Sequence, residues 1–191
     1  MDDEPRRTPD ALGPILADAA RLGFTMSCEP RTGSLLATLA ASKPGGRLLE
    51  LGTGVGAGTA WLLEGMTGTA RLVSVDADPR FQEVAERHLG HDPRVVFETA
   101  DADAWLDGYD GPPFAMAFVD CRPGKFHRLP DLLDLLEPGG LYVVDDLIPQ
   151  PTWPADHPER VAGFLRAVPD ERRMRATPLH WASGVLVGAR L

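Results

Sequence analysis

The sequence contains very little cysteine and very little lysine. Its 191 residues include two cysteines, Cys28 and Cys121, whose spacing fits neither a zinc motif nor a disulfide scaffold, so reduced thiols are expected. Of the 19 basic residues that are lysine or arginine, two are lysines, Lys43 and Lys125. A lysine in a suggestive place therefore carries more weight here than in an average sequence.

Long apolar runs and net positive charge are also missing. No apolar stretch approaches the roughly 18 residues that a membrane-spanning helix needs, and the start, "MDDEPRRTPD", has no apolar signal core. The formal net charge of −9 disfavours nucleic acid as a partner. Hydrophobic content of 43% is typical of a globular domain. We therefore expect one cytoplasmic domain over residues 1–191, with no membrane or nucleic-acid partner.

Apolar strands alternate with helical periodicity along most of the chain. Helices are expected near 9–22, 32–42, 58–66, 79–89, 101–108, 129–136 and 157–167, and strands at 47–51, 71–77, 94–100, 114–120, 139–147, 172–181 and 184–191. This alternation predicts an α/β fold, a Rossmann-like doubly wound sheet of about seven strands. The sheet should be mostly parallel, with a terminal antiparallel hairpin because its last two strands are joined by a short turn.

The chain divides into three parts by this pattern. Residues 1–45 hold the N-terminal helices, residues 46–146 form a ligand-binding core, and residues 147–191 hold a proline-rich specificity loop, a helix and the hairpin. Ligands of such sheets bind at the carboxyl ends of the strands. Four of those ends carry acidic residues: Glu50, Asp76, Asp120 and the pair Asp145–Asp146.

Four glycines follow the first strand in "RLLELGTGVGAG", at 52, 54, 56 and 58. Their conformational freedom suggests a ligand that lies almost against the backbone. Gly52, Gly54 and Ala57 fit a dinucleotide-binding pattern, and Asp76 follows the next strand. Glu50, however, is poorly placed beside a pyrophosphate. A ligand that has a cationic amine and no phosphate is favoured.

Four segments in order resemble the motifs of class I S-adenosylmethionine-dependent methyltransferases: "LLELGTGVGAGT", "LVSVDAD", "TADA" and "LLEPGGLYVVDD". The resemblance covers about residues 32–146 and implies S-adenosylmethionine (SAM) as cofactor. It implies contacts from Glu50, Gly52, Thr53, Gly54 and Gly56 in the turn, from Asp76 and Ala77 to the ribose, from Asp101 and Ala102 to adenine, and from Asp120 to the methionyl amine. Trp105 or Phe97 either stacks on the adenine or belongs to the core.

"FVDCRPGKF" and "VVDDL" look most like the catechol and caffeoyl-coenzyme A type of small-molecule O-methyltransferase. That resemblance implies Asp120, Asp145 and Asp146 as ligands of Mg²⁺ or another divalent cation, and Lys125 with Asp120 as catalytic residues. The sequence departs from the pattern, since Pro123 stands where the lysine is usual and Asp146 where asparagine is usual. Asp120 could instead serve the amine alone, Asp146 could cap the following turn, and Lys125 could be a solvated surface residue. If no metal takes part, Lys125 or His127 is the expected base.

The acceptor side is less well defined by the sequence. Aromatic and apolar residues outside the motifs either collect in an acceptor pocket or pack in the core: Phe24, Met26, Trp153, His180 and Trp181. The expected activity is methyl transfer from SAM to a hydroxyl oxygen of a small molecule. An acceptor nitrogen, a macromolecular acceptor and a SAM-binding module without catalysis are the alternatives. A homodimer is the default oligomer.

Overall fold

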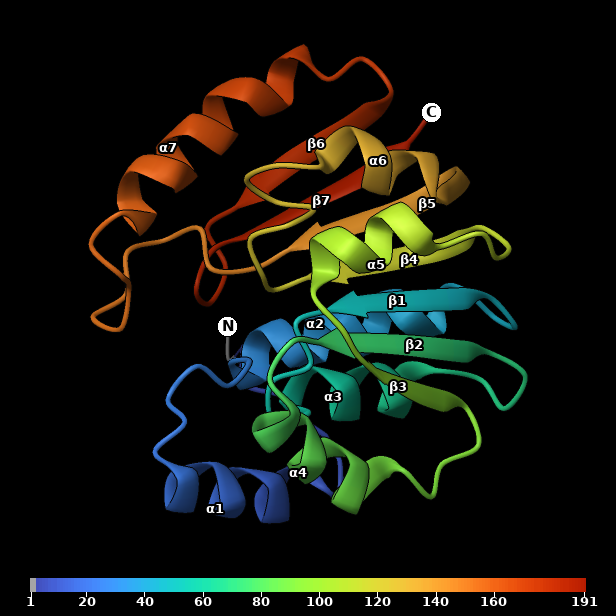
Figure 1. Cartoon of the computed structure of the whole chain (residues 1–191), viewed down its shortest axis with the longest axis vertical. Coiled ribbons are helices and arrows are strands. Elements are labelled where there is room, and N and C mark those ends of the chain that lie inside the picture. Colours follow the sequence, from blue (N-terminus) through green and yellow to red (C-terminus); the bar gives the residue numbers. More distant parts are fainter. Residues whose placement is uncertain (1–2) are drawn as a thin grey trace.

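Seven strands form one mixed sheet in the order β3-β2-β1-β4-β5-β7-β6 (Figure 1). The computed structural model describes residues 3–191. The strands are β1 (Arg47–Leu51), β2 (Arg71–Asp76), β3 (Val95–Thr99), β4 (Phe114–Val119), β5 (Leu136–Val144), β6 (Met174–Leu179) and β7 (Val185–Arg190). β1 to β5 are mutually parallel, and β7 runs antiparallel to both β5 and β6. The predicted fold class is confirmed.

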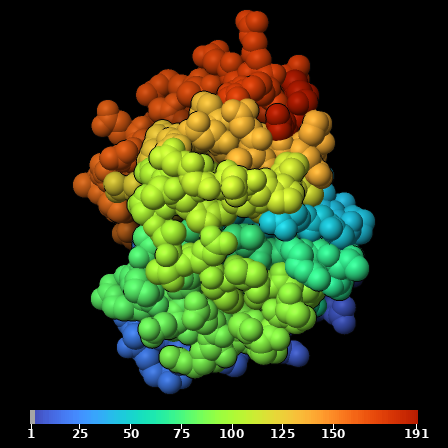
Figure 2. All heavy atoms as spheres, turned by 45° about the vertical axis from the view of Figure 1, so that its right-hand side comes forward, coloured from blue at the N-terminus to red at the C-terminus, as the bar shows by residue number. Residues whose placement is uncertain are grey.

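In the part of the chain that the structure describes, seven α-helices cover the two faces of this sheet. Those packed on one face are α1 (Leu12–Leu22), α2 (Pro30–Ala41), α3 (Ala57–Gly65) and α4 (Pro79–Leu89). Those on the other are α5 (Ala102–Gly108), α6 (Leu129–Asp134) and α7 (His157–Ala167), which a 3₁₀ turn at Val168–Asp170 continues. From another side, Figure 2 shows the N-terminal part at the bottom, α4 to β4 in the middle and the C-terminal part at the top.

The central strands are apolar on both sides because helices cover both faces. Leu48 and Met116 point into the core cluster beneath α1 to α4, whereas Leu49 and Ala117 point into the cluster beneath α5 to α7. All six residues of β4 are buried. In this setting Glu50, which has no exposed surface, is an ionisable side chain within the sheet, opposite the buried Ser74 of β2.

Most boundaries differ from the sequence prediction by one to three residues, and two of these differences bear on the site. The helix expected at 129–136 ends at Asp134, because the main-chain N–H of Phe114 donates to the carbonyl of Leu135 (2.8 Å) and draws the following residues into β5. At its other end β5 stops at Val144. Asp145 and Asp146 therefore lie beyond the strand rather than within it, where their side chains are free of the pleat.

Both cysteines are free thiols, as expected. Within residues 3–191, no helix combines the length and the apolar character needed to span a bilayer.

Candidate active site

A cavity of about 740 Å³ lies at the carboxyl ends of the parallel strands. In Figure 1 these ends point to the left, toward the segment between α1 and α2 and the loop before α7. Sequence-predicted residues that line the cavity are Glu50, Gly52, Thr53, Gly54, Asp76, Asp120, Lys125, Asp145 and Asp146. The structure thus brings together acids from four separate strand ends.

The glycine turn is shaped largely by the protein's own atoms. A Cβ atom at Gly52 (φ 100°) would lie 2.8 Å from the carbonyl oxygen of Asp120, and one at Gly56 (φ 91°) would lie 2.6 Å from Cβ of Ala85 on α4. Gly56 does not line the cavity. Both glycines therefore admit neighbouring elements of the fold, and Gly52 also lines the cavity. Their contacts with a ligand stay a prediction.

The other two glycines lie against side chains on the cavity wall. A Cβ atom at Gly54 (φ 50°) would lie 2.9 Å from the ring of Phe24, and one at Gly58 would lie 2.6 Å from Oε1 of Glu50. Phe24 and Glu50 both line the cavity. Here the missing side chains leave room for groups that face the cavity interior.

Glu50 is a buried carboxylate with one oxygen satisfied and one not. Thr59 and Ser74 each donate a hydroxyl to Oε2 at 2.5 Å, whereas Oε1 has no hydrogen-bond partner among the described residues. Burial raises the pKa of Glu50 to about 7, against the two hydroxyl donors, which lower it. A buried acceptor atom of this kind fits an incoming ammonium group, which would satisfy both its hydrogen bonding and its charge.

Asp76 is fixed by two main-chain donors. The N–H of Gly54 donates to Oδ2 (2.7 Å) and the N–H of Asp78 donates to Oδ1 (2.8 Å). Asp78 in turn caps α4 by accepting from the N–H of Arg80 (3.0 Å). The carboxylate keeps lone pairs for a diol, since each oxygen can accept more than one hydrogen bond.

The predicted adenine contacts lie outside the cavity lining. Asp101 is exposed and caps α5 by accepting from the N–H of Ala104 (3.1 Å); Ala77 and Ala102 also lie outside the lining. Trp105 is buried and donates from Nε1 to Glu98 (2.6 Å), so the core alternative holds for it. Adenine contacts from Asp101 and Ala102 stay a prediction.

Lys125 is buried, with 4% of its surface exposed, and lines the cavity. The alternative of a solvated surface lysine is therefore wrong. The loop after β4 turns back at Gly124, whose φ of 80° suits glycine and whose carbonyl accepts from the Tyr142 hydroxyl (2.6 Å). Nζ of Lys125 consequently reaches the main-chain carbonyl of Asp145, to which it donates at 3.1 Å.

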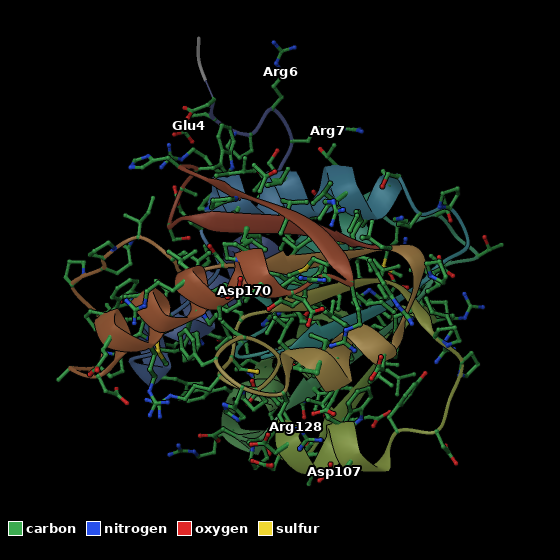
Figure 3. All side chains as sticks on the ribbon, turned by 90° about the horizontal axis from the view of Figure 1, so that it is seen from above. Glu4, Arg6, Arg7, Asp107, Arg128 and Asp170 are labelled. Carbon is green, nitrogen blue, oxygen red and sulfur yellow. The ribbon has the colours of Figure 1, made fainter. Side chains whose placement is uncertain are left out.

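Ion pairs brace this loop against α5 on its outer side. Arg128 contacts Asp107 at 2.5 Å and also pairs with Asp131; Figure 3 shows Arg128 and Asp107 next to each other. His127 is exposed and pairs with Asp103 (3.1 Å). It does not line the cavity, so the alternative that makes His127 the base receives no support from this arrangement.

The two acids nearest Lys125 have raised pKa values. Burial raises the pKa of Asp120 well above its usual range, the Asp145 carboxylate adds to this, and Lys125 opposes it. Burial likewise raises the pKa of Asp145, against the hydrogen bond from Ser183. Oδ1 of Asp145 accepts from the Ser183 hydroxyl (2.5 Å), from the N–H of Asp146 (2.7 Å) and from Thr32 (3.4 Å).

Asp146 is held by two aromatic side chains from the next segment. Nε1 of Trp153 donates to its Oδ1 (2.5 Å), and Nε2 of His157 lies 3.2 Å from its Oδ2. The Trp153 and His157 rings contact each other, with centroids 4.4 Å apart. We call these three residues the acceptor-loop clip. His157 was not predicted as a site residue. The sequence feature that could have indicated it is its position at the start of a helix, directly after the proline-rich loop.

The predicted acceptor residues separate into two groups. Phe24, Met26 and Trp153 line the cavity. His180 is exposed outside it, and Trp181 packs against the core while its Nε1 donates to the carbonyl of Arg31 (3.0 Å). The core alternative therefore holds for Trp181, because the hairpin that carries both residues turns toward α2. His180 belongs to neither the cavity lining nor the core.

The site fits the two implied groups unequally. The unpartnered Glu50 oxygen and the Asp76 carboxylate suit the amine and ribose of SAM. For a metal ion the fit is poor: in the part of the chain that the structure describes, no three histidine, cysteine or acidic side chains are arranged to hold one. The carboxylates of Asp120, Asp145 and Asp146 all line the cavity, but they are not arranged around one point where an ion could bind.

Comparison with known proteins points to one family. A family model described as a methyltransferase domain matches residues 49–147. A catechol O-methyltransferase of Niastella koreensis is 30% identical over 147 residues, which is 73% of this chain and 66% of that protein. A catechol O-methyltransferase of Mycobacterium tuberculosis is 31% identical over 144 residues, 72% and 65% of the two chains. The aligned part spans between about half and two thirds of such relatives' length.

Solved structures give the same fold over nearly the whole chain. An O-methyltransferase from Bacillus cereus, in complex with S-adenosylhomocysteine, superimposes with a TM-score of 0.84 at 21% identity, covering 97% of this chain and 93% of that one. With a matching family model over more than half of its residues and a seven-stranded sheet of the same kind, the chain belongs to the methyltransferase-domain family.

Proposed function

We propose that this protein transfers a methyl group from SAM to a hydroxyl oxygen of a small molecule. The observation that carries the proposal is one continuous cavity, which runs from Glu50 and Asp76 at the glycine turn to Lys125 and Trp153 beyond β4 and β5. Cofactor and acceptor can therefore meet within a single cavity. The names of the curated relatives support the same reaction class.

SAM supplies an electrophilic methyl group on a sulfonium, which the acceptor oxygen displaces in line. In our proposal Oε1 of Glu50 and the Asp120 carboxylate accept from the methionyl amine, and Asp76 accepts from the ribose hydroxyls. Gly52, Thr53 and Gly54 provide the close backbone approach. The chain's contribution is then mainly orientation of the two reactants.

On the acceptor side, Lys125 and Asp120 are the proposed catalytic residues, since both line the cavity. The loop before α7 is the proposed source of specificity through Trp153. A divalent cation such as Mg²⁺ on Asp120, Asp145 and Asp146 stays a prediction of the sequence, and we route no step through it. The cytoplasmic location and the homodimer also stay predictions; light scattering after gel filtration tests the dimer.

Calorimetry with S-adenosylhomocysteine (SAH) and with NAD tests the cofactor. SAH should bind and NAD should not, because an unpartnered carboxylate repels a pyrophosphate; binding of NAD alone would overturn the proposal. SAH release from SAM with a panel of phenols and other hydroxyl compounds, with and without EDTA, tests the reaction. If SAH binds but turnover occurs only on amines or macromolecules, the acceptor is not a small-molecule hydroxyl. If no acceptor is turned over, the protein is a SAM-binding module without catalysis.

A further inference from the structure

Two of the three acids that the family resemblance assigns to a metal, Asp145 and Asp146, are already engaged by the protein. Asp146 directs one carboxylate oxygen to the indole N–H of Trp153 and the other to the His157 ring. Its φ of 65° lies in the left-handed region that L-residues seldom adopt, so the main chain itself is turned to make this clip. A carboxylate held at both oxygens by one loop is a structural anchor rather than a metal ligand.

Asp145 is engaged at one of its carboxylate oxygens. Three protein donors converge on its Oδ1, from Ser183, from the main chain of Asp146 and, at longer distance, from Thr32. A hard cation needs several oxygen ligands with free lone pairs in a compact shell. Since the donors around Asp145 and Asp146 are hydroxyl, N–H and imidazole groups, this pair supplies few such lone pairs.

A cationic side chain is buried at the same place. Lys125 has 4% of its surface exposed, and its Nζ lies 5.0 Å from the Phe126 ring centroid. One of its three N–H donors is used by the carbonyl of Asp145, and no other hydrogen bond of Nζ appears among the described residues. Arg122 also lines the cavity, but it is exposed and contacts Asp156 at 3.3 Å. Lys125 is therefore the enclosed positive charge of the acceptor side.

We infer that the Lys125 ammonium supplies the positive charge that a divalent cation would otherwise provide, and that the site works without a metal. The inference rests on the proposed function for its acceptor. The ammonium donates to the acceptor oxygen and stabilises its anionic form, while the hydroxyl proton goes to water in the open cavity. The new O–CH₃ bond then forms as the S–CH₃ bond breaks, and the electron pair of that bond stays on sulfur, which becomes a neutral thioether.

The first test does not depend on turnover. The protein, stripped with EDTA and saturated with SAH, is titrated with Mn²⁺ while the free ion is followed by electron paramagnetic resonance. The expected result is no saturable binding, as in a protein-free blank. One tightly bound Mn²⁺ per chain, lost in Asp145→Ala, would overturn the inference even if no acceptor is ever found.

The second test addresses the charge of Lys125. Lys125→Met should lower kcat by about a hundredfold, the usual effect of removing an oxyanion donor, with SAH affinity unchanged. The rise of kcat with pH should also move to higher pH, because the acceptor hydroxyl loses its cation. Lys125→Arg should restore part of the rate. A pH profile that does not move in Lys125→Met would contradict the inference.

The chain's other lysine gives a matched control. Lys43 donates from Nζ to the carbonyl of Gly139 (2.9 Å), near the amino ends of the strands and away from the cavity lining. Lys43→Met should therefore leave kcat and its pH profile unchanged. Turnover that EDTA abolishes and Mg²⁺ restores would also overturn the inference, whereas absence of turnover on every acceptor would count against the proposed function and leave the Mn²⁺ titration decisive.

Discussion

Glu50→Gln should remove a loss of folding stability that the wild-type protein suffers as the pH rises toward neutral. The pKa of Glu50 is raised from an ordinary value of 4.5 to about 7 by burial, so the folded state keeps a proton that the unfolded chain releases. The stability that the protonated Glu50 contributes to the folded state is fully present below pH 4.5 and is lost as the pH rises through about 7. A shift of this size corresponds to about 3 kcal/mol of unfolding free energy.

Glutamine cannot ionise, but its amide oxygen can still accept from Thr59 and Ser74. The unfolding free energy of Glu50→Gln minus that of the wild type should therefore grow by about 3 kcal/mol from pH 4.5 to pH 7.5, measured by urea denaturation with circular dichroism. Glu64→Gln, on the exposed side of α3, controls for the loss of one charge. A difference that stays constant over this pH range would refute the reasoning.

The same variant also tests the proposed contact with the cofactor. If the SAH amine lies at Oε1, binding favours the ionised carboxylate, so the SAH affinity of the wild type should rise with pH up to about 7 and then level off. Glu50→Gln should bind more weakly and lack this rise. Parallel affinity profiles for the two proteins would place the amine elsewhere.

Three further changes probe separate parts of the cavity. Asp76→Asn should weaken SAH binding at least tenfold, since it disturbs charge-assisted bonds worth roughly 1.5–3 kcal/mol each; an unchanged dissociation constant would remove Asp76 from the site. Gly54→Ala forces a side chain onto a φ of 50° and should lower the melting temperature, whereas Gly13→Ala, on an open part of α1, should not; equal melting temperatures would contradict the strain. Trp153→Phe loses the N–H that reaches Asp146 and should raise the acceptor KM without changing SAH affinity; a change in SAH affinity alone would contradict the clip's place on the acceptor side.

The sheet and the convergence of its acids could be predicted because both follow from short-range pattern. Apolar strands alternating with helices require parallel pairing, and the carboxyl ends of parallel strands meet at one edge. Glu50, Asp76 and Asp120 therefore share a cavity wherever the helices begin and end. Errors of one to three residues at element ends do not disturb this, since each of these acids lies within one residue of the end of its strand.

The partners of those acids could not be predicted in the same way. Lys125 becomes buried through a left-handed Gly124 and a hydrogen bond from Tyr142, which lies on the following strand. The acceptor-loop clip forms across an irregular proline-rich segment. This segment has no helical or strand periodicity from which its contacts could be predicted. At Gly52 and Gly56, the space that a side chain would fill is occupied by atoms from the end of β4 and from α4. Only three-dimensional packing brings those atoms to the glycine turn.

The Phe24 ring has a kinetic consequence. It lies against Gly54, and its centroid is 4.7 Å from that of Phe81 on α4, so the segment after α1 roofs the glycine turn. That segment starts at Gly23, whose φ of 68° marks a left-handed end to α1, and α1 itself is anchored to α4 by Asp18, which contacts Arg87 (3.1 Å) and His88 (2.8 Å). We therefore expect a molecule bound at the turn to leave when this short segment opens, so that the packing of Phe24 on Phe81 lengthens its residence time.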